Sequence, residues 1–331
     1  MLAKYNAKIA GTGMYVPDKI LNNFDLEKIV ETSDEWIRTR TGMIERRVAS
    51  TEQASSDLAY EASLNALKSA HLRAKDIDLI IVGTISPDHP FPSTACVLQH
   101  KLGVKHIPAF DVSAGCPGWI FASSIAKQFI ENGTYNNILV VGVEILTKIT
   151  NYSDRNTCVL FGDGSGAAVF SRTESTDIAL IIDSEIAADG SYGDILIQKA
   201  GGSRNPATEE TVRENLHTVY MEGNKIFKLA VRSMYHACDI VLKRNHLDVK
   251  SIDWLITHQA NMRIIEALGR KMKIDKKKVI VNIEKYGNTS SATIPMALDE
   301  SIKSGKIRSG DIVLMASFGA GLTSGSLLVR I

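Results

Sequence analysis

The chain has 331 residues, of which 44% are hydrophobic, so it is long enough for one large or two ordinary globular domains. Its 38 Lys and Arg residues nearly balance its 37 Asp and Glu residues, which excludes an overall charge that would attract nucleic acid or an anionic membrane. The first residues, MLAKYNAKIAGTGMYVP, lack the features of a signal peptide, and no later apolar stretch approaches about 20 residues, so we expect a cytoplasmic protein.

Continuous apolar runs alternate with helical patterns along the first half of the chain. The runs are IDLIIVGTI (77–85), IPAFDVSA (107–114), NILVVGVEI (137–145) and GAAVF (166–170). Such runs are typical of strands buried on both faces of a largely parallel sheet. The pattern predicts an α/β fold.

The second half repeats this order. It contains IDWLITHQ (252–259), RIIEALGRKM (263–272), KVIVNIEKYGN (278–288), SSATIPMALDESIKSG (290–305) and GDIVLMASF (310–318). An offset of about 172 to 175 residues aligns the halves and places Asn288 opposite Cys116. We therefore predict two duplicated halves, residues 1–174 and 175–331, with the two aligned residues meeting at the centre.

Cys116 lies in DVSAGCPGW (111–119), between a predicted strand and a predicted helix. Gly115 and Gly118 permit a sharp turn, and Pro117 fits the first helical position. We expect Cys116 to be the N-cap, where the helix dipole lowers the thiol pKa below about 8.5. From these residues alone, a nucleophile and a packing residue both remain open. Three other cysteines have no CxxC spacing and are interpreted as packing residues: Cys96, Cys158 and Cys238.

His258 and Asn288 each follow a predicted strand of the second half. Working side chains often occupy the carboxyl ends of strands in α/β proteins. A buried asparagine amide offers two donors to an oxygen that gains negative charge. Together with Cys116, these residues indicate an acyl-transfer site.

Neither a metal nor a nucleotide cofactor is expected. The remaining histidines and the cysteines show no metal-ligand spacing. The stretch IAGTGMYVP (9–17) lacks the third glycine of a dinucleotide loop, and FGDGSGAAVF (161–170) has no lysine in P-loop spacing.

Six segments spread over nearly the whole chain closely resemble β-ketoacyl-acyl-carrier-protein synthase III, the initiating condensing enzyme of bacterial fatty-acid synthesis. The segments are TSDEWIRTRTG, FPSTAC, DVSAGCPGW, FGDGSGAAV, THQANMRI and KYGNTSSATIPMAL. The resemblance implies a thiolase-like fold, in which two duplicated α/β halves form five αβαβα layers. This agrees with the repeat that the sequence shows independently.

The resemblance also implies a mechanism. Cys116 would attack the thioester of an acyl-CoA primer, with acetyl-CoA as the expected primer, and hold the acyl group covalently. His258 and Asn288 would stabilise the enolate formed when malonyl-acyl carrier protein loses carbon dioxide. The backbone amides of Cys116 and Ala320 would form the oxyanion hole. CoA is a substrate in this scheme, and no cofactor is implied.

Binding residues are implied in the same way. The residues that match CoA contacts of the family are Thr32, Trp36, Arg40, Arg155 and Asn261. The residues that match its carrier-docking segment are Gln259, Ala260, Asn261, Met262 and Arg263. Phe91 resembles a residue that closes the acyl pocket of the partner subunit, so a homodimer is implied. Without the resemblance, a core tryptophan and a solvated arginine would be the preferred interpretations of Trp36 and Arg263.

Two positions depart from the family pattern. Ala320 stands where glycine is frequent, and Ser324 stands where many members have tryptophan. Chain-elongating synthases use a second histidine where this chain has Asn288, which disfavours that class. A secondary-metabolite ketosynthase, an acyl-CoA transferase of the same fold and a noncatalytic CoA-binding or carrier-binding subunit remain as alternatives.

Overall fold

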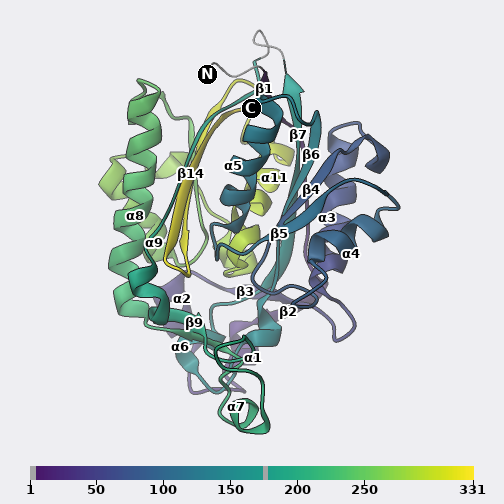
Figure 1. The fold of residues 1–331 in the computed structure, drawn as a ribbon. Coiled ribbons are helices and arrows are strands. Elements are labelled where there is room, and N and C mark those ends of the chain that lie inside the picture. The colour runs from purple at the N-terminus through teal and green to yellow at the C-terminus, as the bar shows by residue number, and fades with distance from the viewer. Residues whose placement is uncertain (1–4, 174–177) are drawn as a thin grey trace.

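Two five-stranded sheets face each other in the computed structural model, which describes residues 5–173 and 178–331 (Figure 1). The first sheet contains, in spatial order, β1 (Asn6–Tyr15), β7 (Asp163–Thr173), β6 (Asn137–Ile145), β4 (Leu79–Gly83) and β5 (Ala109–Val112). The second contains β8 (Leu180–Ala188), β14 (Thr323–Arg330), β13 (Ile312–Gly319), β11 (Trp254–Thr257) and β12 (Val279–Ile280). The two orders correspond strand by strand, in agreement with the predicted duplication. The predicted boundary between residues 174 and 175 lies outside the described residues.

Each sheet is mixed. Strand β4 is parallel to β5 and β6, but β7 is antiparallel to both β6 and β1. The second sheet repeats this pattern, with β11 parallel to β12 and β13, and β14 antiparallel to β13 and β8. The expectation of a largely parallel sheet is therefore wrong for the half of each sheet that holds the antiparallel strands. Helices cover both faces, so antiparallel strands are also buried on both sides and carry the same apolar runs.

The helices complete a five-layer arrangement (Figure 1). Helices α5 (Gly118–Glu131) and α11 (Thr293–Lys303) lie between the sheets. The outer face of the first sheet is covered by α3 (Ser55–Ser69) and α4 (Thr94–Lys101). The outer face of the second is covered by α8 (Gly223–Arg244) and α9 (Met262–Met272).

The central layer joins the two halves through one core. Ile120 of α5 and Ile294 of α11 are both buried in a cluster that includes Ile81 of the first sheet and Ile256 of the second. Burying each such side chain stabilises the fold by about 1.5–3 kcal/mol relative to leaving it in water. Because both sheets contribute to this cluster, the halves pack as one unit around the two central helices.

Shorter elements gather mainly around one end of the sheets, at the bottom of the view in Figure 1. They are β2 (Lys19–Asn22), α1 (Asn23–Leu26), α2 (Asp34–Thr41), β3 (Glu45–Val48), α6 (Arg155–Cys158), β9 (Leu196–Gln198), α7 (Glu209–Arg213), β10 (Val219–Met221) and α10 (Ile283–Tyr286). The 3-10 turns are η1 (Ala74–Asp76), η2 (Leu146–Ile149), η3 (Gly190–Ile195), η4 (Val249–Ser251), η5 (Lys276–Lys278) and η6 (Ser290–Ala292). Within residues 5–173 and 178–331, no helix is both long and apolar enough to cross a membrane.

Candidate active site

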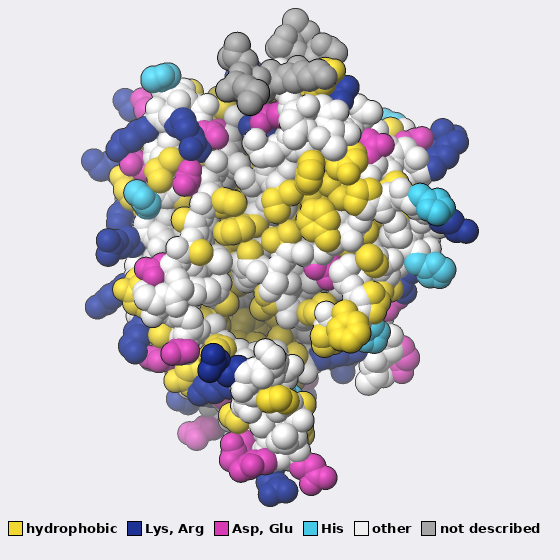
Figure 2. Space-filling model, viewed as in Figure 1, with side chains coloured by type: hydrophobic (Ala, Val, Ile, Leu, Met, Phe, Trp, Pro, Cys, Tyr) yellow, Lys and Arg dark blue, Asp and Glu magenta, His cyan; other side chains and the backbone are white. Residues whose placement is uncertain are grey.

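One cavity of about 1140 Å³ brings the three predicted catalytic residues together. Its wall includes Cys116 from the first half and His258 and Asn288 from the second. Apolar side chains of β9 and β10 also line it, including Leu196 and Val219. In Figure 2 the surface is hollowed next to the protruding segment that carries α7, and hydrophobic side chains line the hollow. The cavity is therefore suited to a long ligand with an apolar part.

Cys116 lies in the turn that joins β5 to α5. Gly115 has a φ of +62°, which favours glycine, and the amide of Gly118 donates to the Gly115 carbonyl at 2.9 Å. The N-cap is Pro117, and its carbonyl accepts a bond from Phe121. The prediction that Cys116 is the N-cap is wrong by one residue. Cys116 belongs to the turn closed by the bond between Gly118 and Gly115, and the helix begins after Pro117.

Burial sets the protonation state of the Cys116 thiol. Loss of solvation raises its pKa to about 12, a neighbouring Ser290 hydroxyl opposes this rise, and the charge of Glu144 adds to it. The expected lowering of the thiol pKa is therefore wrong. The residue keeps partial exposure along the cavity, so a ligand reaches a neutral thiol.

The backbone of residues 319 and 320 packs directly against that of Gly115 and Cys116. A Cβ atom on Gly319 would lie only 2.5 Å from the Cys116 nitrogen, so no larger residue fits there. Among residues 5–173 and 178–331, neither the Cys116 amide nor the Ala320 amide has a backbone acceptor. Ala320 does not have a positive φ, so alanine causes no strain at this position. Two neighbouring N–H groups are thus available beside the sulfur.

His258 follows β11, as predicted, and only 3% of its surface is exposed. Its amide donates to the Ala316 carbonyl at 2.8 Å, and its Nδ1 lies 2.7 Å from the Thr293 hydroxyl. Burial lowers the pKa of the imidazole to about 3, so the ring is neutral near pH 7. Nε2 is left for a ligand in the cavity.

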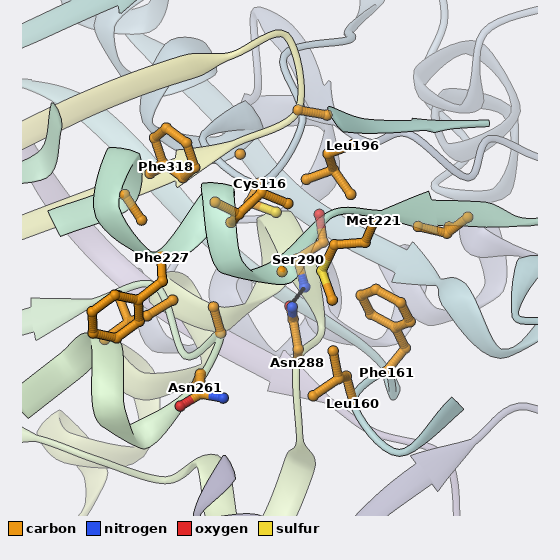
Figure 3. A pocket seen from close by; sticks show the side chains of 18 of the residues that line it. Cys116, Leu160, Phe161, Leu196, Met221, Phe227, Asn261, Asn288, Ser290 and Phe318 are labelled. Carbon is orange, nitrogen blue, oxygen red and sulfur yellow. Dashed lines mark hydrogen bonds between the residues drawn. The ribbon is translucent and has the colours of Figure 1, made fainter. Parts of the chain in front are cut away.

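Asn288 is held by its backbone and by its own side-chain oxygen (Figure 3). Its amide donates to the Leu160 carbonyl at 2.9 Å, and its carbonyl accepts from Gly162 at 3.1 Å. Its Oδ1 accepts from the Ser290 amide at 2.8 Å. Since the oxygen is engaged inside the protein, the NH₂ group is the part of this carboxamide that remains for a ligand.

Comparison with known proteins identifies the arrangement. A family model described as 3-oxoacyl-[acyl-carrier-protein (ACP)] synthase III matches residues 110–190, and the corresponding description of its C-terminal part matches residues 242–331. A β-ketoacyl-[acyl-carrier-protein] synthase III of Caldanaerobacter subterraneus is 54% identical over 330 residues, which cover 100% of this chain and 99% of the relative. The chain belongs to this family.

Further members of the synthase III family agree over the full length. The synthase III of Clostridioides difficile is 49% identical, with 98% of each chain covered. The crystal structure of 3-oxoacyl-[acyl-carrier-protein] synthase III from Aquifex aeolicus VF5 is 46% identical, has a TM-score of 0.90 and covers 98% of this chain and 100% of its own. These relatives confirm the predicted thiolase-like α/β fold and the predicted acyl-transferring condensing enzyme of fatty-acid synthesis.

Four of the five residues that match CoA contacts of the synthase III family lie near the cavity entrance or around Trp36. Trp36, Arg40 and Asn261 line the cavity. The guanidinium carbons of Arg155 and Arg40 lie 4.9 and 5.0 Å from the centre of the Trp36 ring. The fifth residue, Thr32, is partly buried, and its hydroxyl has no partner among the described residues.

The residues of the predicted carrier-docking segment differ in how deeply they are buried. Gln259 is 1% exposed, donates to the Thr257 carbonyl at 2.8 Å and accepts from the Asn282 amide at 3.1 Å. It supports the strand ends from inside, so its side chain has no surface to offer a carrier. The neighbouring Ala260, Asn261 and Met262 are partly buried, and Arg263 is exposed.

Phe91 is 85% exposed in the segment between β4 and α4. Among the described residues, it is the most exposed of the large hydrophobic side chains. Cys158 and Cys238 are buried, as expected, but Cys96 is exposed, although its sulfur lies 3.5 Å from the Ala109 carbonyl of β5. Ser324 of β14 is nearly buried beside a second cavity of about 470 Å³.

Two site residues were not predicted from the sequence. Ser290 follows the Asn288 segment and lines the cavity, and Glu144 lies behind it, fully buried. The carboxylate at the end of the apolar run NILVVGVEI was a signal, because an acidic residue seldom ends a strand of this kind without a partner. Across the described part of the chain, no group of three or more His, Cys, Asp or Glu residues is arranged to hold a metal ion.

Proposed function

We propose that this chain condenses a short acyl-CoA primer, acetyl-CoA first among them, with malonyl-acyl carrier protein. The products are CoA, carbon dioxide and a β-ketoacyl chain that is two carbons longer. The observation that carries the proposal is one cavity in which Cys116, His258 and Asn288 meet beside two unpaired backbone amides.

In the first half-reaction, the sulfur of Cys116 attacks the thioester carbon of the primer. The Cys116 and Ala320 amides bind the oxygen that becomes negative in the tetrahedral intermediate. The bond to the CoA sulfur then breaks, CoA leaves as a thiolate that takes a proton from solvent, and the acyl group stays on Cys116. Each oxyanion donor contributes about 3 kcal/mol to such a step.

In the second half-reaction, His258 and Asn288 bind the thioester carbonyl of malonyl-acyl carrier protein. When the Thr293 hydroxyl donates to Nδ1, the neutral imidazole carries its proton on Nε2. This N–H and the NH₂ of Asn288 are then the donors that stabilise the enolate when carbon dioxide leaves. The carbanion attacks the acyl carbon, and the Cys116 sulfur is the leaving group. The product remains on the carrier.

CoA and the carrier approach through the same entrance. Trp36 and Arg155 form an aromatic and cationic pair that suits stacking with adenine, with Arg40, Asn261 and the unpaired Thr32 hydroxyl nearby. Exposed Arg263 lies at the cavity edge, together with Lys225 and Lys228 of α8. These cations suit an acidic carrier surface.

Phe91 supports a homodimer in which it closes the acyl pocket of the partner subunit. Moving this exposed ring out of water would stabilise a dimer by about 1.5–3 kcal/mol per subunit. A large residue in that position favours short primers.

The proposal is tested by adding the substrates in two steps. Acetyl-CoA alone should leave an acetyl group on Cys116, detected by peptide mass spectrometry, and malonyl carrier should then release carbon dioxide and ketoacyl product. Cys116→Ser should lose the first step. Acylation without decarboxylation would instead support an acyl-CoA transferase, and binding without acylation would support a noncatalytic subunit.

A priming synthase of another pathway is the second candidate. The crystal structure of the priming β-ketosynthase from the R1128 polyketide biosynthetic pathway is 30% identical to this chain, with a TM-score of 0.91. The 54% identity to a β-ketoacyl-[acyl-carrier-protein] synthase III favours a role in fatty-acid synthesis. Turnover over a series of acyl-CoA primers separates the two, because the proposal expects acetyl-CoA to be preferred.

A further inference from the structure

The Ser290 hydroxyl lies between the nucleophile and a buried carboxylate. It donates to Oε1 of Glu144 at 3.1 Å, and it lines the same cavity as the Cys116 side chain, where the hydroxyl lowers the pKa of the thiol. Figure 3 shows Ser290 next to Cys116, with Asn288 joined to it by a hydrogen bond. A single hydroxyl therefore connects Cys116 with Glu144.

Glu144 is fully buried at the end of β6. No cation pairs with it among the described residues, and its other donors come from the segment after β4: the Thr84 hydroxyl at 3.2 Å, the Ile85 amide at 3.1 Å, and the Ser86 amide and hydroxyl at 3.1 and 2.6 Å. A buried carboxylate without a counter-ion is costly even when it is hydrogen-bonded. The fold places this carboxyl group a single hydroxyl away from the nucleophile.

Ser290 reaches this position at a conformational cost. Its φ of +46° lies in the left-handed region, which costs a residue other than glycine about 1 kcal/mol or more. Its amide donates to Asn288, and its carbonyl oxygen lies 2.9 Å from the Thr293 hydroxyl, which also contacts His258. The strained conformation thus places Ser290 in contact with the supports of all three catalytic side chains.

We propose that Ser290 relays the Cys116 proton to Glu144 when the nucleophile is activated. This inference rests on the proposed function, since it concerns the sulfur that attacks the primer. Ser290 is the catalytic link that touches the reacting atom, and Glu144 acts through it.

The proton balance closes over one turnover. The Cys116 S–H bond breaks as its proton passes to the Ser290 oxygen, while the Ser290 proton passes to the Glu144 carboxylate. The negative charge moves to sulfur, and neutral Glu144 stores the proton during acylation. When the acyl chain leaves in the condensation step, the Cys116 thiolate recovers this proton through Ser290. The proton that CoA takes from solvent is the one consumed by the overall reaction.

The groups around the relay make Glu144 a better acceptor than His258. Burial lowers the pKa of His258 to about 3, whereas burial raises the pKa of Glu144 above its usual range. The donors from the β4 segment and from η6 are hydroxyls and amides without charge, and the thiol is the titratable group that Glu144 faces. The transfer moves one charge between two buried sites rather than creating a second charge.

The test is the pH dependence of Cys116 acylation and of its alkylation by iodoacetamide. In the unmodified enzyme, both rates should be nearly level above the pKa of Glu144. In Glu144→Gln, acylation at pH 7 should fall roughly 100-fold and then rise about tenfold per pH unit, because the thiol must lose its proton to solvent. Ser290→Ala should show the same change, and it serves as the second variant if the first fails to fold.

An opposite result would overturn the relay. If Glu144 is merely a like charge beside the sulfur, its removal lowers the thiol pKa, and Glu144→Gln acylates as fast as the unmodified enzyme or faster. Asp299→Asn is the matched control, because Asp299 is also a fully buried carboxylate but is bonded to Thr12 and Lys303 instead. This control should keep the level pH profile; a profile that rises as in Glu144→Gln would assign the effect to general loss of stability.

Measuring decarboxylation distinguishes a failure of the relay from a failure of the proposed function. Cys116→Ala and the double variant Cys116→Ala/Glu144→Gln should release carbon dioxide from malonyl carrier at equal rates, since that step uses His258 and Asn288. A lower rate in the double variant would show a structural role for Glu144 and refute the relay. Absence of Cys116 acylation in the unmodified enzyme would refute the proposed function itself.

Discussion

The Thr293 hydroxyl lies 2.7 Å from Nδ1 of His258 and 2.9 Å from the Ser290 carbonyl oxygen. Thr293 is the first residue of α11, so the central helix of the second half fixes the orientation of the imidazole. When this hydroxyl donates its one proton to Nδ1, Nε2 carries the ring proton and faces the ligand. The position of the ring is therefore set by the duplicated half that supplies it.

Replacing Thr293 with valine keeps the volume but removes this hydroxyl. A buried ring nitrogen without its partner costs about 1–3 kcal/mol, so the release of carbon dioxide from malonyl carrier should fall roughly tenfold or more. Acylation of Cys116 by acetyl-CoA should change less than about twofold. Both rates are measured in single-turnover experiments; an equal loss in the two steps would contradict a role confined to His258.

Folding stability should decrease as the pH falls, partly because of His258. Its pKa is about 3 in the folded protein and 6.5 for an exposed imidazole, so the unfolded chain binds a proton between these values and the folded chain does not. This difference removes about 2 kcal/mol of stability at pH 5 relative to pH 8. Urea unfolding at both pH values should show a smaller loss for His258→Gln, and an identical loss in both proteins would refute the assignment.

Trp36→Ala should weaken CoA recognition without affecting the carrier. Removal of the ring that Arg155 and Arg40 contact should raise the KM for acetyl-CoA roughly tenfold, with little change in kcat. Tyr235→Ala is a matched control, because Tyr235 also contacts a cation, Lys271, but does not line the large cavity. A rise in the KM for malonyl carrier of the same size would argue against a CoA-specific role.

Phe91→Ala should change the choice of primer in a dimeric enzyme. The smaller side chain should increase the rate with primers longer than acetyl-CoA relative to the rate with acetyl-CoA, because it leaves space in the pocket of the partner subunit. Light scattering on the unmodified protein should give the mass of two chains. A monomer with the same primer preference in both proteins would rule out this use of Phe91.

The sequence predicted the chemistry of the site better than its electrostatics. Cys116 lies in a tight turn and His258 follows β11, as the local pattern indicated. Asn288 follows the short helix α10 and not the predicted strand, because β12 ends at Ile280. The expected low pKa of Cys116 was wrong because burial depends on which segments cover the thiol. The covering segments come from distant parts of the chain, and a local motif does not specify them.

Long-range pairing explains the other differences. Glu144 and Ser290 are 146 positions apart. Neither the apolar run that contains Glu144 nor the segment that contains Ser290 indicates that the two residues touch. Gln259 was predicted to belong to a surface segment together with its neighbours in the sequence. Its side-chain oxygen instead accepts a hydrogen bond from the Asn282 amide inside the protein. Strand direction was also missed, because apolar runs report burial on both faces and not the polarity of the neighbouring strand.

The central claim assigns acyl transfer to Cys116 and decarboxylation to His258 and Asn288, and trapping of the acyl-enzyme tests it most directly. His258→Ala and Asn288→Ala are incubated with acetyl-CoA and then with malonyl carrier, and the acetylated Cys116 peptide is measured before and after the second addition. Both variants should acquire the acetyl group and keep it, while the unmodified enzyme loses it. Failure of either variant to become acetylated, or discharge at the rate of the unmodified enzyme, would contradict the account.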